Sequence, residues 1–215
     1  MNSTFLEYLS LITQGLFLGI TLAILLGPIF VALTQIALEK GARAGLVAST
    51  GVWVSDVIII TLCYIFIQRI NYLVVDATFT YWMGLFGGFI LITFGIGAIL
   101  KKVELVFEKN SHTANDYVGF WTKGFLVNTV NPFTFVFWIG VISTYVIKAQ
   151  ISGLKSVVFF SSIMFVIVFT DTLKVFLAKA IRNKLTQRHF TIFSRIAGAG
   201  LIIFGIALLV RSQVF

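Results

Sequence analysis

Long apolar runs separated by short polar segments divide the chain into six parts. Charged residues are rare within the runs, and several runs reach the roughly 20 residues that a helix needs to cross a bilayer. Because backbone polar groups in lipid must be paired within the chain, such runs predict helices. We therefore predict an all-α membrane protein with six transmembrane helices. The runs are Tyr8–Leu38, Ala44–Gln68, Ala77–Leu100, Gly124–Ile147, Ser156–Leu173 and Ile196–Val210.

The composition agrees with a membrane protein and excludes several other classes. Of the 215 residues, 59% are hydrophobic and 11% are charged, whereas about 25% of the residues of a soluble domain are charged. The single cysteine, Cys63, excludes a disulfide scaffold and disfavours an electron carrier. No Walker, HExxH or serine-triad pattern occurs, and neither His112 nor His189 has companions at metal-ligand spacing. The sequence therefore predicts no enzyme, no cofactor and no metal site.

Basic residues outnumber acidic ones by 16 to 8, which gives a net charge of +8. They lie between the apolar runs, which is typical of topology determinants rather than of a nucleic-acid-binding surface. The odd-numbered connections hold eleven of them, namely Lys40, Arg43, Lys101, Lys102, Lys109, Lys123, Lys179, Arg182, Lys184, Arg188 and Arg195. The tails and even-numbered connections hold four, namely Arg69, Lys148, Lys155 and Arg211. This bias predicts a multi-pass protein of the cytoplasmic (inner) membrane with both termini outside.

The N-terminal segment carries Glu7 and has no Lys or Arg before residue 40. A cleaved signal peptide begins with a positively charged region. We therefore expect the first apolar run to remain in the mature protein.

Three features recur in the same order in the two halves of the chain. They are, in pairs, Gly88–Leu100 with Gly198–Val210, Gly27-Pro28 with Asn131-Pro132, and Ser55-Asp56 with Thr170-Asp171. The first pair has six identities in thirteen positions, and the second pair is 104 residues apart. Since each half holds three helices, the second half enters the membrane the other way up. The prediction is two inverted three-helix repeats, residues 1–110 with a cytoplasmic loop and residues 111–215, in one membrane domain.

A proline lies inside the first and the fourth apolar runs, where it removes a backbone donor and clashes with the preceding turn. These positions predict broken helices 1 and 4, with Pro28 and Pro132 as first residues of the second half-helices and Asn131 as an N-cap. Freed amides and the helix dipole there would hold a carboxylate. The candidate translocation residues are therefore Gly27, Pro28, Asn131, Pro132 and Asn128. The alternative is that the prolines are kinks that only aid packing.

Two acidic residues lie within apolar runs, where a charge at the bilayer centre costs on the order of 3 kcal/mol. Asp56 lies near the middle of its run, and Asp171 has Lys174 three residues later. Both carboxylates are candidates to carry the proton or to bind a substrate amine. For Asp171 the alternative is a structural ion pair with Lys174 at a helix end, because side chains at i and i+3 are neighbours.

Glycines in the third and sixth runs have the spacing of closely packed membrane helices. We predict that these two helices pack tightly and assign the glycines no chemistry. They are Gly84, Gly87, Gly88 and Gly95 in the third run, and Gly198, Gly200 and Gly205 in the sixth. The tryptophans Trp53, Trp82, Trp121 and Trp138 are interpreted as core or interfacial residues.

The segment Gly27–Ile60, which begins GPIFVALTQIALEKG, resembles the first two helices of the LysE-type amino-acid exporters. The segment Lys123–Gly140, KGFLVNTVNPFTFVFWIG, resembles their fourth helix, and the resemblance extends over essentially the whole chain. It implies a carrier that exports amino acids or related metabolites, driven by the proton gradient, with both breaks at the translocation centre. Many members have Pro-Gly-Pro-Asn at the first break, whereas here Leu26 and Ile29 replace the first proline and the asparagine.

We therefore predict a secondary transporter that exports an amino acid or related small metabolite, coupled to protons. Its partners would be the small-molecule substrate, protons and the lipid bilayer, with no nucleic acid. The alternative is a transporter of a divalent cation or another small solute. A cation site calls for several converging carboxylates, and only Asp56 and Asp171 are available within the runs. The direction of transport rests on the resemblance. The residues do not specify which substrate is carried or whether the protein forms a homo-oligomer.

Overall fold

The computed structural model describes residues 2–24, 28–69, 77–100, 113–180 and 186–212, and these are almost entirely helical. Gly27, one of the predicted site residues, lies outside the described residues. The helices are α1 (Asn2–Ile24), α2 (Pro28–Lys40), α3 (Ala42–Arg69), α5 (Ala77–Leu100), α6 (Ala114–Thr129), α7 (Pro132–Ile142), a π-helical segment (Ser143–Lys148), α8 (Leu154–Ala180) and α9 (Gln187–Ser212).

The predicted runs locate the helices but mostly not their ends. α5 has the predicted bounds, whereas α8 continues past the run that ends at Leu173, as far as Ala180. α6 begins well before Gly124 because Thr113 and Asp116 form a capping box in front of it. A charge-free run marks the apolar part of a helix, and a helix continues until a cap or a turn ends it.

Four described helices are long and apolar enough to cross a membrane, namely Thr4–Ala23, Ala42–Phe66, Leu154–Ala180 and Gln187–Val210. A fifth candidate is the pair of segments Ala114–Thr129 and Phe133–Lys148, which meet at 61°. The predicted break of the fourth run is therefore confirmed. In the first run α1 ends at Ile24 and α2 begins at Pro28, and residues 25–27 between them lie outside the described residues.

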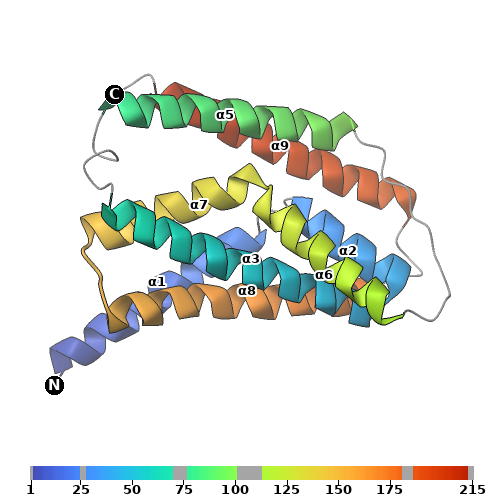
Figure 1. Ribbon diagram of the computed structural model, residues 1–215, viewed down its shortest axis with the longest axis horizontal. Helices are drawn as coiled ribbons and strands as arrows, with labels where there is room; N and C mark the ends of the chain where they lie inside the picture. The colour runs from blue at the N-terminus through green and yellow to red at the C-terminus, as the bar shows by residue number, and fades with distance from the viewer. Residues whose placement is uncertain (1, 25–27, 70–76, 101–112, 181–185, 213–215) are drawn as a thin grey trace.

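The helices pack in a two-layer arrangement. α5 and α9 lie side by side as an outer layer and contact the other helices mainly through α7 and α2 (Figure 1). In the larger layer α1 packs along α8, and α3 packs along α6. α1 begins and α9 ends on the same side of the molecule (Figure 1).

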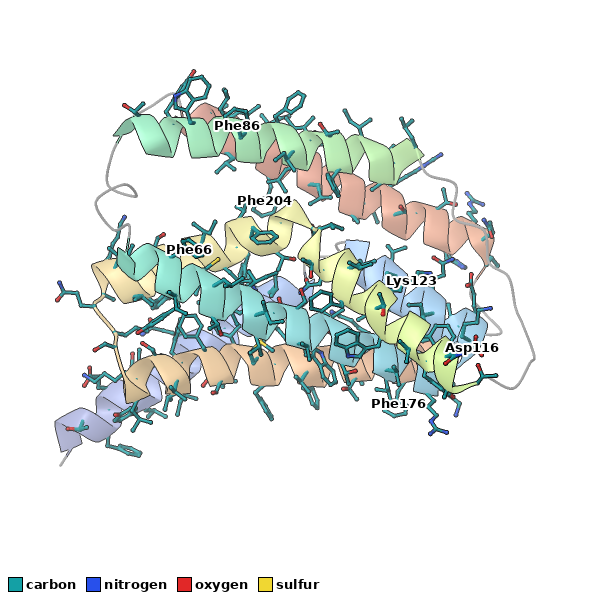
Figure 2. The ribbon with its side chains drawn as sticks, viewed as in Figure 1. Phe66, Phe86, Asp116, Lys123, Phe176 and Phe204 are labelled. Carbon is teal, nitrogen blue, oxygen red and sulfur yellow. The ribbon has the colours of Figure 1, made fainter. Side chains whose placement is uncertain are left out.

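The outer surface of the helices is apolar. Phe66, Phe86 and Phe176 are each more than half exposed and point away from the helices (Figure 2). Phe204 instead lies edge-on to Phe133, with ring centroids 5.5 Å apart, where the outer layer meets α7. Such a surface is stable in lipid, because apolar side chains there have no water to avoid.

The predicted close packing of the third and sixth helices is confirmed for four glycines. A methyl group added at Gly88 or Gly205 would lie 2.7 Å from the carbonyl oxygen of the other residue. The corresponding distances for Gly95 and Gly198 are 2.6 and 2.5 Å. Gly200 differs, because nothing lies within 4 Å of an added methyl group there. Gly88 of α5 therefore meets Gly205 of α9, and Gly95 meets Gly198, so the two helices run antiparallel.

The capping box of α6 gives a first prediction. The Thr113 hydroxyl accepts from the Asp116 backbone N–H at 3.4 Å, and the Thr113 N–H donates to Asp116 Oδ2 at 2.7 Å. We expect Thr113→Ala to lower the free energy of unfolding by about 1 kcal/mol, the typical effect of losing such a cap. Thermal unfolding of the detergent-purified protein measures this, with Thr113→Ser as the control that keeps the hydroxyl. Equal stability of Thr113→Ala and wild type would show that the cap contributes nothing.

Candidate functional site

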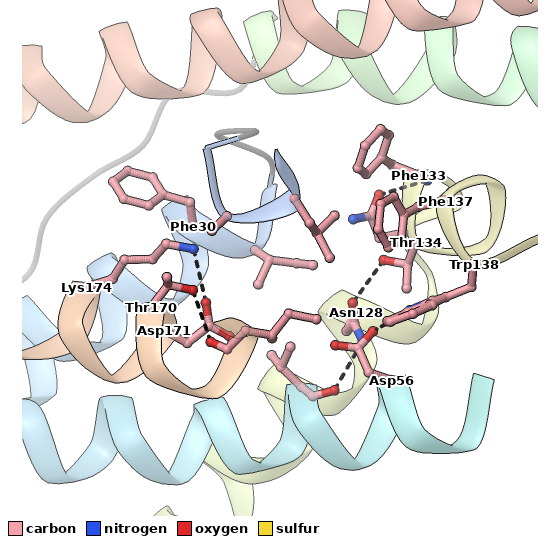
Figure 3. Close-up of a pocket in the computed structure, with 16 residues that line it drawn as sticks. Phe30, Asp56, Asn128, Phe133, Thr134, Phe137, Trp138, Thr170, Asp171 and Lys174 are labelled. Atoms are coloured by element: carbon pink, nitrogen blue, oxygen red, sulfur yellow. Dashed lines mark hydrogen bonds and ion pairs between the residues drawn. The ribbon is translucent and has the colours of Figure 1, made fainter. Parts of the chain in front are cut away.

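A small cavity of about 60 Å³ lies where the two helix breaks meet α3 and α8 (Figure 3). Five of the predicted site residues line it, although they come from four different parts of the chain. They are Asp56 of α3, Asn128 of α6, Asn131 in front of α7, and Asp171 and Lys174 of α8. Pro28 and Pro132 are the first residues of α2 and α7, as predicted.

The carboxylate of Asp56 is held by two neutral donors. Its Oδ1 accepts from Asn128 Nδ2 at 3.0 Å and from Trp138 Nε1 at 2.9 Å. Asn128 is itself oriented by the Thr134 hydroxyl, which donates to its Oδ1 at 2.9 Å, and by the carbonyl of Val52. Asp56 is only 4% exposed. Among the described residues no cation contacts it, so its charge has no counter-ion there.

Two polar atoms beside this network have no hydrogen-bond partner among the described residues. They are Oδ2 of Asp56 and Nδ2 of Asn131, on side chains that are 4% and 3% exposed. Both residues line the cavity. Neither atom is completely buried, whereas the Thr34 hydroxyl of α2 is both completely buried and without a hydrogen-bond partner among the described residues. An acceptor and a donor are therefore available to a bound molecule.

The second carboxylate, Asp171, has a different environment. Its Oδ1 accepts from Lys174 Nζ at 3.1 Å, which is the ion pair that the i+3 spacing predicts. Its Oδ2 accepts from Trp53 Nε1 at 3.2 Å. Both oxygens of Asp171 are thus occupied and its charge is compensated by Lys174, in contrast to Asp56.

The start of α7 confirms one prediction and corrects another. Asn131 is the N-cap, and its Oδ1 accepts from the Phe133 N–H at 3.1 Å. The Thr134 N–H donates to the Asn131 carbonyl, and the Asn131 N–H donates to the Asn128 carbonyl, both at 3.1 Å. The prediction that freed amides at this break hold a carboxylate is therefore wrong for these three amides, because the chain already pairs them. The side-chain Nδ2 of Asn131 is the donor that remains.

Sequence reasoning missed the roles of Trp53, Trp138 and Thr134, which were interpreted as packing residues or not singled out. A usable signal was present, because a buried indole N–H needs an acceptor. Asp56 and Asp171 are the two acidic side chains within the apolar runs, and each receives one indole. In the described part of the chain, no three His, Cys, Asp or Glu side chains come together as a metal site requires.

The sequence pattern of the LysE type translocator family matches residues 20–212, a range that contains every residue lining the cavity. The chain belongs to this family. It is also 25% identical over 190 residues, which are 87% of this chain and 90% of the relative, to the "Putative amino acid efflux protein YcgF" of Bacillus subtilis (strain 168). No solved structure matches the chain significantly. The family and the apolar helices together identify a membrane transporter.

Proposed function

We propose that this LysE-family protein exports an amino acid across the cytoplasmic membrane in exchange for protons. The observation that carries the proposal is Asp56, a buried carboxylate whose free oxygen faces a cavity between two broken helices. Broken helices that meet in the middle of a membrane protein are the usual place of a transporter's binding site. The family and the name of the Bacillus subtilis relative support the amino acid as substrate.

The chemistry of Asp56 supports exchange. A buried carboxylate held only by the neutral donors Asn128 and Trp138 is destabilised by the loss of water. Binding one cation offsets this desolvation. The ammonium group of an amino acid and a proton are both such cations, and they compete for the same oxygen. When a proton displaces the ammonium group, the amino acid is released, so export is coupled to proton uptake. Asp171 remains a second candidate for the proton.

The packing supports two inverted repeats, residues 1–110 and 111–215. A shift of 110 residues carries Gly88 to Gly198 and Gly95 to Gly205. The same shift turns the contact of Gly88 with Gly205 into the contact of Gly198 with Gly95, as a two-fold axis between antiparallel helices requires. The contact of α1 with α8 likewise corresponds to that of α6 with α3.

Six spans follow from this correspondence if α1 with α2 and α6 with α7 each form one broken span, and if α5 is a span. The start of α1 and the end of α9 on one side of the molecule agree with an even number of crossings (Figure 1). The excess of Lys and Arg in the odd-numbered connections supports a topology with both termini outside.

The size of the cavity supports alternating access. A space of about 60 Å³ holds a few water molecules, since one water needs at least ~10–15 Å³ of such space. An amino acid therefore binds only when the walls of the cavity separate. Rocking of one repeat against the other would open the site to each side of the membrane in turn.

Transport in liposomes that contain the purified protein tests the proposal. Counterflow of labelled amino acids, measured one at a time, reports binding and alternation without net proton movement. Accumulation in vesicles with an acidic interior reports coupling, because an antiporter drives its substrate into the more acidic compartment. We expect wild type to show both activities, Asp56→Asn to lose pH-driven accumulation, and Asp116→Asn, the same change at an exposed carboxylate, to keep it.

Each result separates one part of the proposal from the rest. Loss of counterflow in Asp56→Asn is the result expected if the substrate ammonium group binds Asp56. Counterflow that persists would limit this residue to coupling and overturn the competition of ammonium group and proton for its oxygen. Exchange by wild type that is indifferent to the pH gradient would remove the proton from the mechanism. If no amino acid exchanges with the folded wild-type protein, amino-acid export itself is wrong.

A further inference from the structure

The two helix breaks are related by a shift of 104 residues but differ in polarity. Three polar side chains at the second break line the cavity, those of Asn128, Asn131 and Thr134. The corresponding residues of the first break are Ile24, Gly27 and Phe30. One end of the site is therefore built for hydrogen bonding, and the same positions at the other end carry no polar side chain.

The structure has the same asymmetry around the cavity. The described residues that α1 and α2 contribute to its wall are all apolar, namely Leu22, Ala23, Ile29 and Phe30. The polar groups of the wall come from α3, α8 and the second break (Figure 3). In Figure 3, Phe30 extends from the start of α2, whereas Asn128, Thr134 and Asp56 lie together on another side.

The unpaired atoms of the polar side fit the two groups that all amino acids share. Asp56 Oδ2 is an acceptor for an ammonium group, and Asn131 Nδ2 is a donor for a carboxylate. Both atoms are on residues that line one cavity, and both residues are almost fully buried. Asn131 lies three residues after Asn128, which donates a hydrogen bond to Asp56. The Asn131 N–H also donates to the Asn128 carbonyl. Both partners therefore belong to the polar side of the same cavity.

The remaining charges of the cavity are already matched. Asp171 is paired with Lys174 through one oxygen and with Trp53 through the other. A basic or acidic substrate side chain would have to break this pair to find a counter-ion, which leaves a buried charge unpaired. A hydroxyl placed against the wall of α1 and α2 would lose its hydrogen bonds to water and find no side-chain partner among the described residues there.

We propose that the substrate is an amino acid with an apolar side chain. Its ammonium group binds Asp56 Oδ2, its carboxylate binds Asn131 Nδ2, and its side chain packs against Leu22, Ile29 and Phe30. This inference rests on the proposed function, because it assumes that the cavity binds an amino acid. It adds a side-chain subsite at the first break and names Phe30 as a residue that determines specificity.

Counterflow in liposomes also tests the subsite, with the ratio of labelled leucine to labelled threonine exchange as the readout. The two amino acids share the ammonium and carboxylate groups, so the ratio reports the side-chain subsite and is independent of the amount of protein. We expect wild type to exchange leucine at least about tenfold faster than threonine, in line with the burial of one aliphatic side chain. Unlabelled lysine and glutamate should compete poorly with leucine.

A substitution that gives the first break a residue of the second tests whether the apolar wall at Phe30 sets the specificity. Phe30→Thr gives position 30 the same residue type as Thr134, its counterpart in the second break. We expect the leucine-to-threonine ratio to fall about tenfold. Phe30→Leu keeps an apolar wall and should keep the ratio near that of wild type. Phe135→Thr is the matched control, because Phe135 lies in α7, is 37% exposed and is not among the residues lining the cavity.

The outcomes distinguish the subsite from the proposed function. If wild type exchanges threonine, lysine or glutamate faster than leucine, the apolar subsite is wrong and amino-acid transport stands. An unchanged ratio in folded Phe30→Thr overturns the placement of the side chain at the first break. If Phe30→Thr does not fold, the wild-type ratio still decides the substrate class. Absence of exchange for every amino acid overturns the proposed function and this inference together.

Discussion

Adding one methyl group at Gly124 is expected to destabilise the protein severely, while the same addition at Gly119 of the same helix is expected to be harmless. A methyl group at Gly124 would lie 2.0 Å from the carbonyl oxygen of Ala48 in α3, which is backbone and cannot turn aside. At Gly119 nothing lies within 4 Å of the added group. Gly→Ala in a helix otherwise stabilises it by roughly 0.5–1 kcal/mol, so the two variants should change stability in opposite directions.

The expected size follows from how closely α3 and α6 approach each other. From the other side, a methyl group at Gly51 would lie 2.2 Å from the carbonyl oxygen of Trp121, so neither helix has room to yield. Overpacking of this kind costs about 1–3 kcal/mol or more even where side chains can adjust, and we expect at least the upper value here. The same approach sets the 3.0 Å hydrogen bond from Asn128 of α6 to Asp56 of α3.

Thermal unfolding and gel filtration of the detergent-purified variants measure this difference. Gly119→Ala should match or exceed wild type, and Gly124→Ala should unfold at a much lower temperature or fail to accumulate as a monodisperse species. Similar stability of the two variants would mean that α3 and α6 are farther apart than the structure has them.

Much of the fold could be predicted from the sequence because lipid leaves few options. A run such as Ala77–Leu100 must be helical in a membrane, and α5 has those bounds. Proline removes a backbone donor, so the break before Pro132 and the start of α2 at Pro28 were also predictable. The start of α6 was not, because it depends on a cap at Thr113 that lies outside the apolar run.

The acidic and asparagine side chains of the candidate site were predictable, and so was the pair of Asp171 with Lys174, but the other pairings were not. Buried acidic residues and helix breaks are visible in a sequence, and Asp56, Asn128, Asn131 and Asp171 do line one cavity. Which donor reaches which carboxylate depends on how the helices rotate and cross. Trp138, which is 82 residues from Asp56 in the chain, donates to it because α7, bent by 61° from α6, still contacts α3.

Removing Lys174 alone is expected to destabilise the protein more than removing the whole ion pair. Lys174→Met leaves the carboxylate of Asp171, which is 4% exposed, without its cation, and breaking a buried pair in this way costs about 3–5 kcal/mol. In the double variant Asp171→Asn/Lys174→Met no charge remains, and the asparagine oxygen can still accept from Trp53 Nε1. The double variant should therefore recover most of the lost stability. Lys179→Met, an exposed change later in α8, is the control for loss of a positive charge.

The same double variant decides between the two carboxylates as the carrier of the proton. If Asp171 is the structural partner of Lys174, the double variant should regain pH-driven accumulation of the amino acid along with its stability. We expect this outcome, because both Asp171 oxygens are already occupied while Asp56 Oδ2 faces the cavity. A double variant that is stable and active in counterflow, but no longer responds to the pH gradient, would transfer the proton-carrying role from Asp56 to Asp171. If Asp56 carries the proton, the variant with asparagine at position 171 must still accumulate the amino acid in response to the pH gradient.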